Sequence, residues 1–78
     1  MKLGYHGHAF DRMTERGITE GDVLNALQNH TERILTPKNS YRYTGPGLNG
    51  RRLKVWVKLP DTNPSDDKVV KSVAWRDE

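Results

Sequence analysis

One segment near the start of the chain combines an imidazole with two guanidinium groups at helical spacing. His8, Arg12 and Arg16 are four residues apart, and residues four apart on an α-helix lie about 40° from each other around its axis. The three side chains therefore share one side of a short helix. A titratable ring beside two permanent cations suits a site that handles an anionic phosphate. The alternative interpretation is a surface helix with scattered charge.

This combination predicts RNA cleavage by transesterification. That reaction needs one group that takes the 2′-hydroxyl proton, a second that protonates the leaving oxygen, and cations that stabilise the pentavalent phosphate. His8 can transfer a proton near neutral pH, and cationic side chains can stabilise the phosphate without a metal ion. The expected catalytic residues are His8, Arg12, Arg16 and Lys54, together with a tyrosine, Tyr43, or Ser72. The alternative for His8 is that it only caps its helix and donates to a backbone carbonyl.

Aromatic and cationic side chains occur together on several predicted strands. Trp56 lies between Lys54 and Lys58 on one face of its strand, where the ring could stack on a base while the lysines hold phosphates. We expect Tyr43 or Trp56 to position a base. The expected RNA-binding residues are Arg42, Arg52, Trp56, Lys58, Trp75 and Arg76. The alternative for Trp56 is a half-buried ring whose rim is covered by lysine stems.

The positive charge is concentrated in the middle of the chain. The formal net charge is +3, yet residues 38–60 hold six cations and no acid, whereas the remaining residues hold seven cations and ten acids. A local positive field favours phosphate backbones or an acidic protein as the partner. The alternative is a solvated sheet face.

Length and composition limit the class of protein. With 78 residues, of which 33% are hydrophobic, the chain is expected to form one small domain. It has no cysteine, which excludes disulfides and thiolate metal sites. His6 and His8 are the only closely spaced pair of metal-ligand type, so we expect neither a metal ion nor a cofactor. No apolar run approaches the roughly 20 residues that cross a bilayer, and no membrane partner is expected.

Two helices are predicted in the first 30 residues. The first begins near residue 6 or 7 and ends at Arg16, where Gly17 suits a left-handed cap. Thr19 and Asp22 resemble a capping box, which predicts the start of a second helix that runs to about Asn29. His30 then lies where its ring can interact favourably with the carboxyl end of that helix.

Alternating side chains predict strands after His30. We expect them at residues 32–36, 40–44, 51–59 and 68–76, with a polar loop at 60–67. The apolar face of the third strand consists of Leu53, Val55, Val57 and Leu59. For the strand at 40–44, the alternation leaves open whether its two tyrosines, or Arg42 and Thr44, lie on the same face as Trp56.

These elements predict an α+β domain. Short links favour antiparallel pairing of consecutive strands. We therefore expect two N-terminal helices packed on a twisted four-stranded antiparallel sheet, in one domain over residues 1–78. The helices should cover the apolar face of the sheet and leave the basic face open.

The motif H-A-x-x-R-M-x-x-R-G-I at residues 8–18 resembles the signature of a small bacterial toxin-like domain family. The resemblance covers residues 8 to about 59, and the order of elements is similar to that of RelE and BECR-fold ribonuclease toxins. It implies that His8, Arg12 and Arg16 are signature positions and that Ser72 is the hydroxyl residue of the last strand. Because BECR toxins vary widely in their catalytic residues, the resemblance implies fold and class more than a catalytic list.

The resemblance also implies a biological role. It implies a toxin that cleaves tRNA or ribosome-associated RNA without a metal ion and so inhibits bacterial growth. Such domains occur alone or at the C-terminal ends of polymorphic and contact-dependent growth inhibition toxins. A larger parent chain would then carry the export signal, and the toxin would act in the cytoplasm of the target cell. An immunity protein or antitoxin is the implied protein partner, and an acidic one would fit the basic face.

Two rival functions follow from the same residues. The first is a non-catalytic nucleic-acid-binding module, which would use the aromatic and basic side chains without cleaving RNA. The second is an antitoxin or regulatory domain that binds a protein through its basic face.

Overall fold

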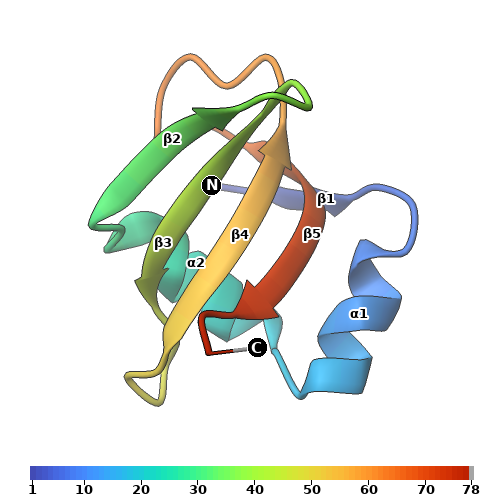
Figure 1. Ribbon diagram of the computed structural model, residues 1–78, viewed down its shortest axis with the longest axis vertical. Helices are drawn as coiled ribbons and strands as arrows, with labels where there is room; N and C mark the ends of the chain where they lie inside the picture. The colour runs from blue at the N-terminus through green and yellow to red at the C-terminus, as the bar shows by residue number, and fades with distance from the viewer. Residues whose placement is uncertain (78) are drawn as a thin grey trace.

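A five-stranded sheet carries two helices on one side and leaves its other face open (Figure 1). The computed structural model describes residues 1–77. Its elements are β1 (Leu3–Tyr5), α1 (Ala9–Arg16), α2 (Glu20–Gln28), β2 (Glu32–Thr36), β3 (Ser40–Pro46), β4 (Arg52–Lys58) and β5 (Lys68–Trp75). α2 packs across β3 and β4, and α1 packs against β5. The α+β class is therefore as expected, with two helices preceding the main strands.

The sheet differs from the expected one in a single strand. Its order is β1-β5-β4-β3-β2, and β1 pairs in parallel with the start of β5, whereas the other neighbours are antiparallel. The expected four-stranded antiparallel sheet was wrong because β1 has only three residues, with Gly4 in the middle. A strand this short has too few residues for a period-of-two pattern. Its partner also lies 65 residues further along, in a register of Leu3 with Lys68.

The end of α1 and the start of α2 follow the expected capping chemistry, whereas α1 begins at Ala9 and not near residue 6 or 7. Gly17 adopts a φ of 65° after α1, and Ile18 N donates to Met13 O at 2.8 Å. This is the left-handed cap that a glycine favours. At the start of α2, the Thr19 side chain accepts from Asp22 N at 3.1 Å, and Thr19 N donates to the Asp22 carboxylate at 2.9 Å. The capping box is thus confirmed with aspartate in the third position.

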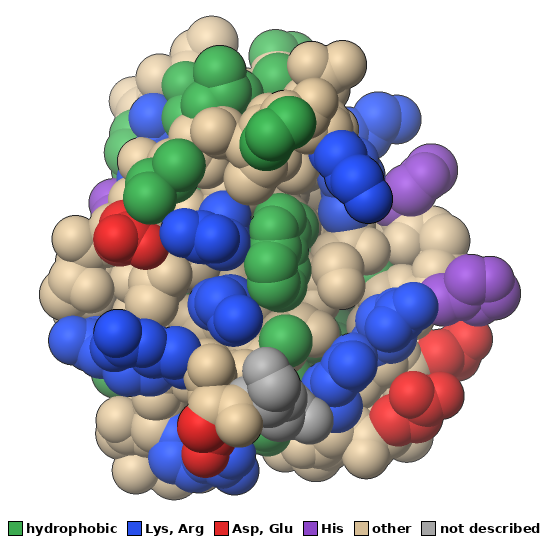
Figure 2. Space-filling view, viewed as in Figure 1, with side chains coloured by type: hydrophobic (Ala, Val, Ile, Leu, Met, Phe, Trp, Pro, Cys, Tyr) green, Lys and Arg blue, Asp and Glu red, His purple; other side chains and the backbone are tan. Residues whose placement is uncertain are grey.

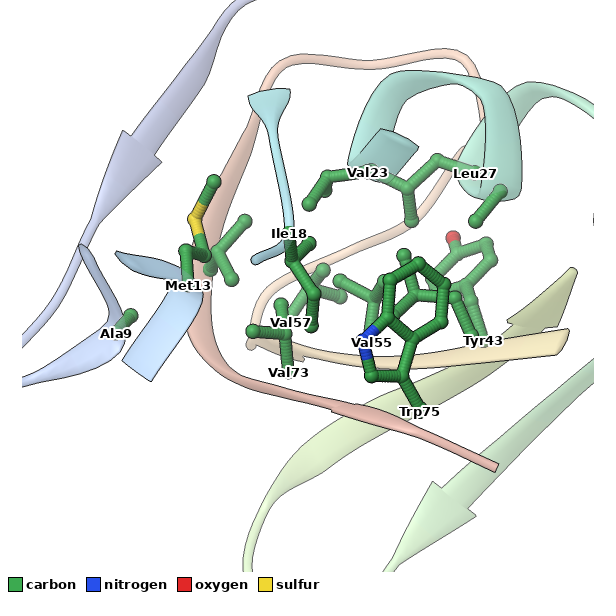
Figure 3. Close-up of a cluster of buried hydrophobic side chains, with 13 residues drawn as sticks. Ala9, Met13, Ile18, Val23, Leu27, Tyr43, Val55, Val57, Val73 and Trp75 are labelled. Carbon is green, nitrogen blue, oxygen red and sulfur yellow. The ribbon is translucent and has the colours of Figure 1, made fainter. Parts of the chain in front are cut away.

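The hydrophobic core lies between the sheet and the two helices (Figure 3). Its buried members are Ala9, Met13, Ile18, Val23, Ala26, Leu27, Tyr43, Leu53, Val55, Val57, Val70, Val73 and Trp75. Complete burial of a valine or leucine side chain contributes about 1.5–3 kcal/mol. Leu53, Val55 and Val57 of the predicted apolar face are buried, and α2 packs against β4. Leu59, the fourth predicted member, lies beyond the end of β4 and is half-buried. Neither helix within residues 1–77 has the length and apolar character needed to cross a bilayer.

α1 packs along the part of β5 that lies beyond its pairing with β1. β1 pairs only with residues 68–70, and beyond them Arg16 Nη1 donates to Val73 O at 3.3 Å. In return, Trp75 Nε1 donates to Arg16 O at 2.9 Å. The last residue of α1 therefore satisfies a strand carbonyl that would otherwise lack a partner strand.

α2 and β3 approach each other closely at Gly45. A Cβ atom at this position would lie 2.3 Å from Ala26 O and 3.0 Å from the Cα of His30. Both neighbours are backbone atoms, which cannot rotate away as a flexible side chain would. The absence of a side chain at Gly45 thus sets the distance between the helix and the sheet.

Gly45→Ala is expected to lower the free energy of unfolding by about 3 kcal/mol, because the added methyl group forces α2 away from β3. Urea denaturation followed by circular dichroism measures the change. Gly4→Ala is the matched control, since its Cβ would meet Val69 Cγ2 at an ordinary 3.8 Å. Equal stability of the two variants would contradict the proposed backbone contact.

Candidate nucleic-acid interface

The strand register decides which side chains share the open face. In one row across the sheet Arg42 pairs with Trp56, and Trp56 pairs with Ser72. In the next row Thr44 pairs with Lys54. Because paired residues of neighbouring strands point to the same side, Arg42 and Thr44 share the face of Trp56. This resolves the facing that the sequence left open.

The first hollow on this face is a basic groove of about 420 Å³. It is lined by Thr31, Glu32, Arg42, Thr44, Arg52, Lys54 and Arg76. Four of these side chains are cations and one is a carboxylate. Cations that converge from separate strands can surround one phosphate and neutralise its charge.

The second hollow, the Trp56 groove, is about 540 Å³. It is lined by Thr36, Pro37, Lys38, Ser40, Arg42, Trp56, Lys71 and Ser72. A β-bulge opposite Trp56 and Val57 makes Lys71 an extra residue in β5, and bulges often redirect a side chain in this way. Figure 2 shows Lys and Arg side chains on either side of apolar side chains over the middle of the sheet.

Arg42 belongs to both grooves. Its Nη2 donates to Glu32 Oε1 at 3.3 Å. Its Nε is buried and has no hydrogen-bond partner among residues 1–77. Lys54 Nζ also lies 5.8 Å from the centre of the Trp56 ring. Arg42 and Lys54 therefore connect the basic groove to the Trp56 groove.

Two aromatic residues expected at the interface lie on the other face. Tyr43 is completely buried and Trp75 is 4% exposed, both within the core that the helices cover (Figure 3). Tyr43 pairs with Val55 and Trp75 with Leu53, which are core positions of β4. The expectation that they contact RNA is wrong, since strand alternation turns them away from Trp56.

The buried Tyr43 hydroxyl takes part in an ionic network that sequence reasoning missed. It donates to the Asp61 carboxylate and accepts from Arg33 Nε at 2.9 Å. Lys68 Nζ also donates to Asp61, and these two side chains are 1% and 2% exposed. No local pattern indicated this network, because the predicted loop at 60–67 looked uniformly solvated.

The network holds Asp61 in its charged form. Burial alone would raise the pKa of Asp61, but hydrogen bonds from Lys68, Tyr43 and Arg33 outweigh burial and lower the pKa from its usual value. The Arg33 guanidinium additionally stacks on the Tyr41 ring at 3.7 Å from its centre. The helix-covered side is therefore stabilised by compensated charges.

The signature residues of α1 lie outside both grooves. His8 is the N-cap residue of α1, but its side chain makes no capping hydrogen bond. Its ring is 86% exposed and lies 3.5 Å from the Asp11 carboxylate. Arg12 is exposed, and Arg16 donates to β5 as described above. The structure thus does not bring His8 into the lining of the hollows that contain Lys54 and Trp56.

Most of the other expected residues line one of the two grooves, and Lys58 lines neither. Arg42, Arg52, Lys54 and Arg76 meet in the basic groove, and Ser72 lies beside Trp56. Lys58 is exposed at the end of β4 and lines neither groove. Glu32, which sequence reasoning did not select, joins the basic groove because β2 pairs with β3.

Comparison with known proteins gives one family. The model of a family described as "Domain of unknown function (DUF4258)" matches residues 5–75. No curated protein and no solved structure matches the chain.

Asp61→Asn is expected to lower the free energy of unfolding at pH 7 by about 3 kcal/mol, because Lys68 then stays buried without an anion. The higher stability of the native protein relative to this variant requires ionised Asp61, whose pKa in the folded state is lower than the 3.8 of the unfolded carboxyl. It should therefore be present above about pH 4 and decline as the pH falls further. Urea denaturation at pH 7 and pH 3 measures this difference.

The control for this prediction is Asp66→Asn, which removes an exposed carboxylate from the same loop. Its effect should stay within about 0.5 kcal/mol. A native protein and an Asp61→Asn variant of equal stability at pH 7 would show that the network does not stabilise the fold.

Proposed function

The chain belongs to a family of domains of unknown function (DUF4258), and from the geometry of its open sheet face we propose that it binds single-stranded RNA there and cleaves it. The observation that carries the proposal is the junction of the two hollows at Arg42. One hollow has the cations that a phosphate requires, and the other has an aromatic ring on which a base can stack.

The spacing of the sheet suits one nucleotide and its phosphate. The Trp56 row and the Lys54 row are two residues apart along β4, a distance of about 7 Å. A base on Trp56 would therefore leave its phosphate beside Lys54. Ser72 and Lys71 flank the ring on the β5 side, where they can contact the sugar or the next phosphate.

Single-stranded RNA is the form that fits this surface. A base can reach the face of Trp56 only after it leaves the stack of a duplex, and loops or ends of RNA offer such bases. The proposed substrates are accordingly unpaired regions of tRNA or of ribosome-associated RNA. The basic groove would stabilise the extra negative charge that develops on a phosphate during cleavage.

The toxin role is part of the same proposal and rests on the resemblance of residues 8–18 to toxin-like domains. The toxin would act on RNA in the cytoplasm of a target cell, delivered as the C-terminal part of a larger chain. An acidic immunity protein or antitoxin would neutralise it by covering the basic groove. The non-catalytic binding module is the second candidate, because the expected proton-transfer residue His8 lies outside the hollows.

Trp56→Ala is expected to weaken binding of a single-stranded RNA oligonucleotide by about 1–3 kcal/mol, the contribution of one stacked base. Fluorescence anisotropy at low salt measures it. Phe10→Ala is the matched control, since Phe10 is an aromatic residue that is 60% exposed on α1. Native protein that does not bind RNA at low salt would exclude an RNA function and favour a protein-interaction domain.

The native protein is expected to cut single-stranded RNA in the presence of EDTA, because cationic side chains take the charge-stabilising role of a metal ion. Gel electrophoresis of an end-labelled oligonucleotide should show fragments that end in a 2′,3′-cyclic phosphate. Binding without fragments would leave the non-catalytic module as the function. Fragments that appear only when a divalent metal is added would contradict the metal-independent mechanism.

A further inference from the structure

The basic groove contains one carboxylate. Of the residues that line the two hollows, Glu32 is the single acidic one. It comes from β2, an edge strand of the sheet, and pairs with Thr44 of β3. It contacts Arg42 and lines the same hollow as Arg52 and Lys54, where we place the phosphate.

Glu32 is held in place but not fully engaged. Its Oε1 accepts from Arg42 Nη2 at 3.3 Å and from Thr44 Oγ1 at 3.4 Å. Among residues 1–77 its Oε2 receives no hydrogen bond, and 49% of the side chain is exposed. One oxygen is thus fixed by the protein while the other can accept a proton from a ligand.

The position of Glu32 leaves room for a phosphodiester. Glu32, Thr44 and Lys54 form a row across β2, β3 and β4. Neighbouring strands are about 4.8 Å apart, so the backbones that carry Glu32 and Lys54 are separated by about 10 Å. The small Thr44 side chain lies between them. A phosphate bound above Thr44 would therefore have the carboxylate on one side and the ammonium group on the other.

Binding alone does not explain a carboxylate here. Two like charges 4 Å apart repel by about 1 kcal/mol in bulk water, and by more at the lower effective dielectric constant of a protein surface. If the groove only bound RNA, a neutral side chain that accepts from Arg42 would serve better. The competing explanation is that Glu32 only orients Arg42.

We propose that Glu32 is the general base of an RNA transesterification in the basic groove, an inference that rests on the proposed function. Glu32 Oε2 takes the proton of the ribose 2′-hydroxyl, and the 2′-oxygen forms a bond to phosphorus. The bond from phosphorus to the 5′-oxygen breaks, and that oxygen takes a proton from the Lys54 ammonium group. The products are a 2′,3′-cyclic phosphate and a 5′-hydroxyl, and proton exchange with water restores both side chains.

This assignment replaces the one expected from the sequence. His8 was expected to transfer the proton, but its ring is highly exposed and lines neither hollow. A general base must reach the proton that it removes, within hydrogen-bonding distance or through one water. Glu32 lines the basic groove, and its half-exposed side chain is accessible to a ligand bound there.

The test compares Glu32→Gln with native protein on a single-stranded RNA oligonucleotide and on the DNA oligonucleotide of the same sequence. Glutamine retains an oxygen that accepts from Arg42 but cannot take the proton. We expect RNA cleavage to slow by about 100-fold or more, the usual contribution of a general base. RNA binding should be unchanged or tighter, because a negative charge is removed. The DNA, which lacks the 2′-hydroxyl, should be bound but not cut.

Glu20→Gln is the matched control. Glu20 also accepts a hydrogen bond, from the Tyr5 hydroxyl at 2.9 Å, and it lies outside both hollows. The Glu20→Gln substitution changes the net charge by the same amount as Glu32→Gln and should leave the cleavage rate near the native value.

The outcomes separate the two proposals. If the native protein cuts RNA and the Glu32→Gln variant cuts it at a rate within threefold of the native rate, the role of Glu32 is overturned. The proposed function then remains intact. Loss of cleavage in His8→Ala alongside such a variant would return the proton transfer to α1. Native protein that binds RNA without cutting it overturns the ribonuclease proposal and the role of Glu32 with it.

Discussion

The alternation of side chains along β3 and β4, continued in β5 on either side of its bulge, is the constraint on which the rest of the structure depends. A strand places successive side chains on opposite faces, so one register assigns Tyr43, Val55 and Val73 to the core and Arg42, Trp56 and Ser72 to the open face. A shift of one residue would bury the cations and expose the valines. The bulge at Lys71 makes this sorting possible in β5, since both Val70 and Val73 reach the core.

Within residues 1–77, charges are paired on the helix-covered face of the sheet and mostly unpaired on the open face. On the helix-covered side, Asp61 and Lys68 are almost fully removed from water and neutralise each other. On the open side, Arg52, Lys54 and Arg76 collect around a hollow whose single acid leaves an excess of positive charge. Compensated charge suits a structural role, whereas uncompensated charge at the surface attracts an anionic partner.

Much of the fold was predictable from local signals. The cap at Gly17, the capping box at Thr19 and the strand at Glu32–Thr36 each depend on neighbouring residues, and the structure confirms them. β1 and the Asp61 network were not predictable, since both depend on partners that are distant in sequence. For the same reason Glu32 escaped notice, because its relation to Lys54 exists only after β2 and β4 pair with β3.

The shared position of Arg42 has a consequence for how a ligand would be recognised. Its guanidinium borders both hollows and is already tethered at one end by Glu32. A nucleoside or an inorganic phosphate would each engage only half of this arrangement. A nucleotide, which joins the two parts, should therefore bind more tightly than the separate affinities of nucleoside and phosphate suggest. Binding of either part would order the Arg42 side chain that the other part also contacts. Recognition of this kind would be cooperative within a single nucleotide.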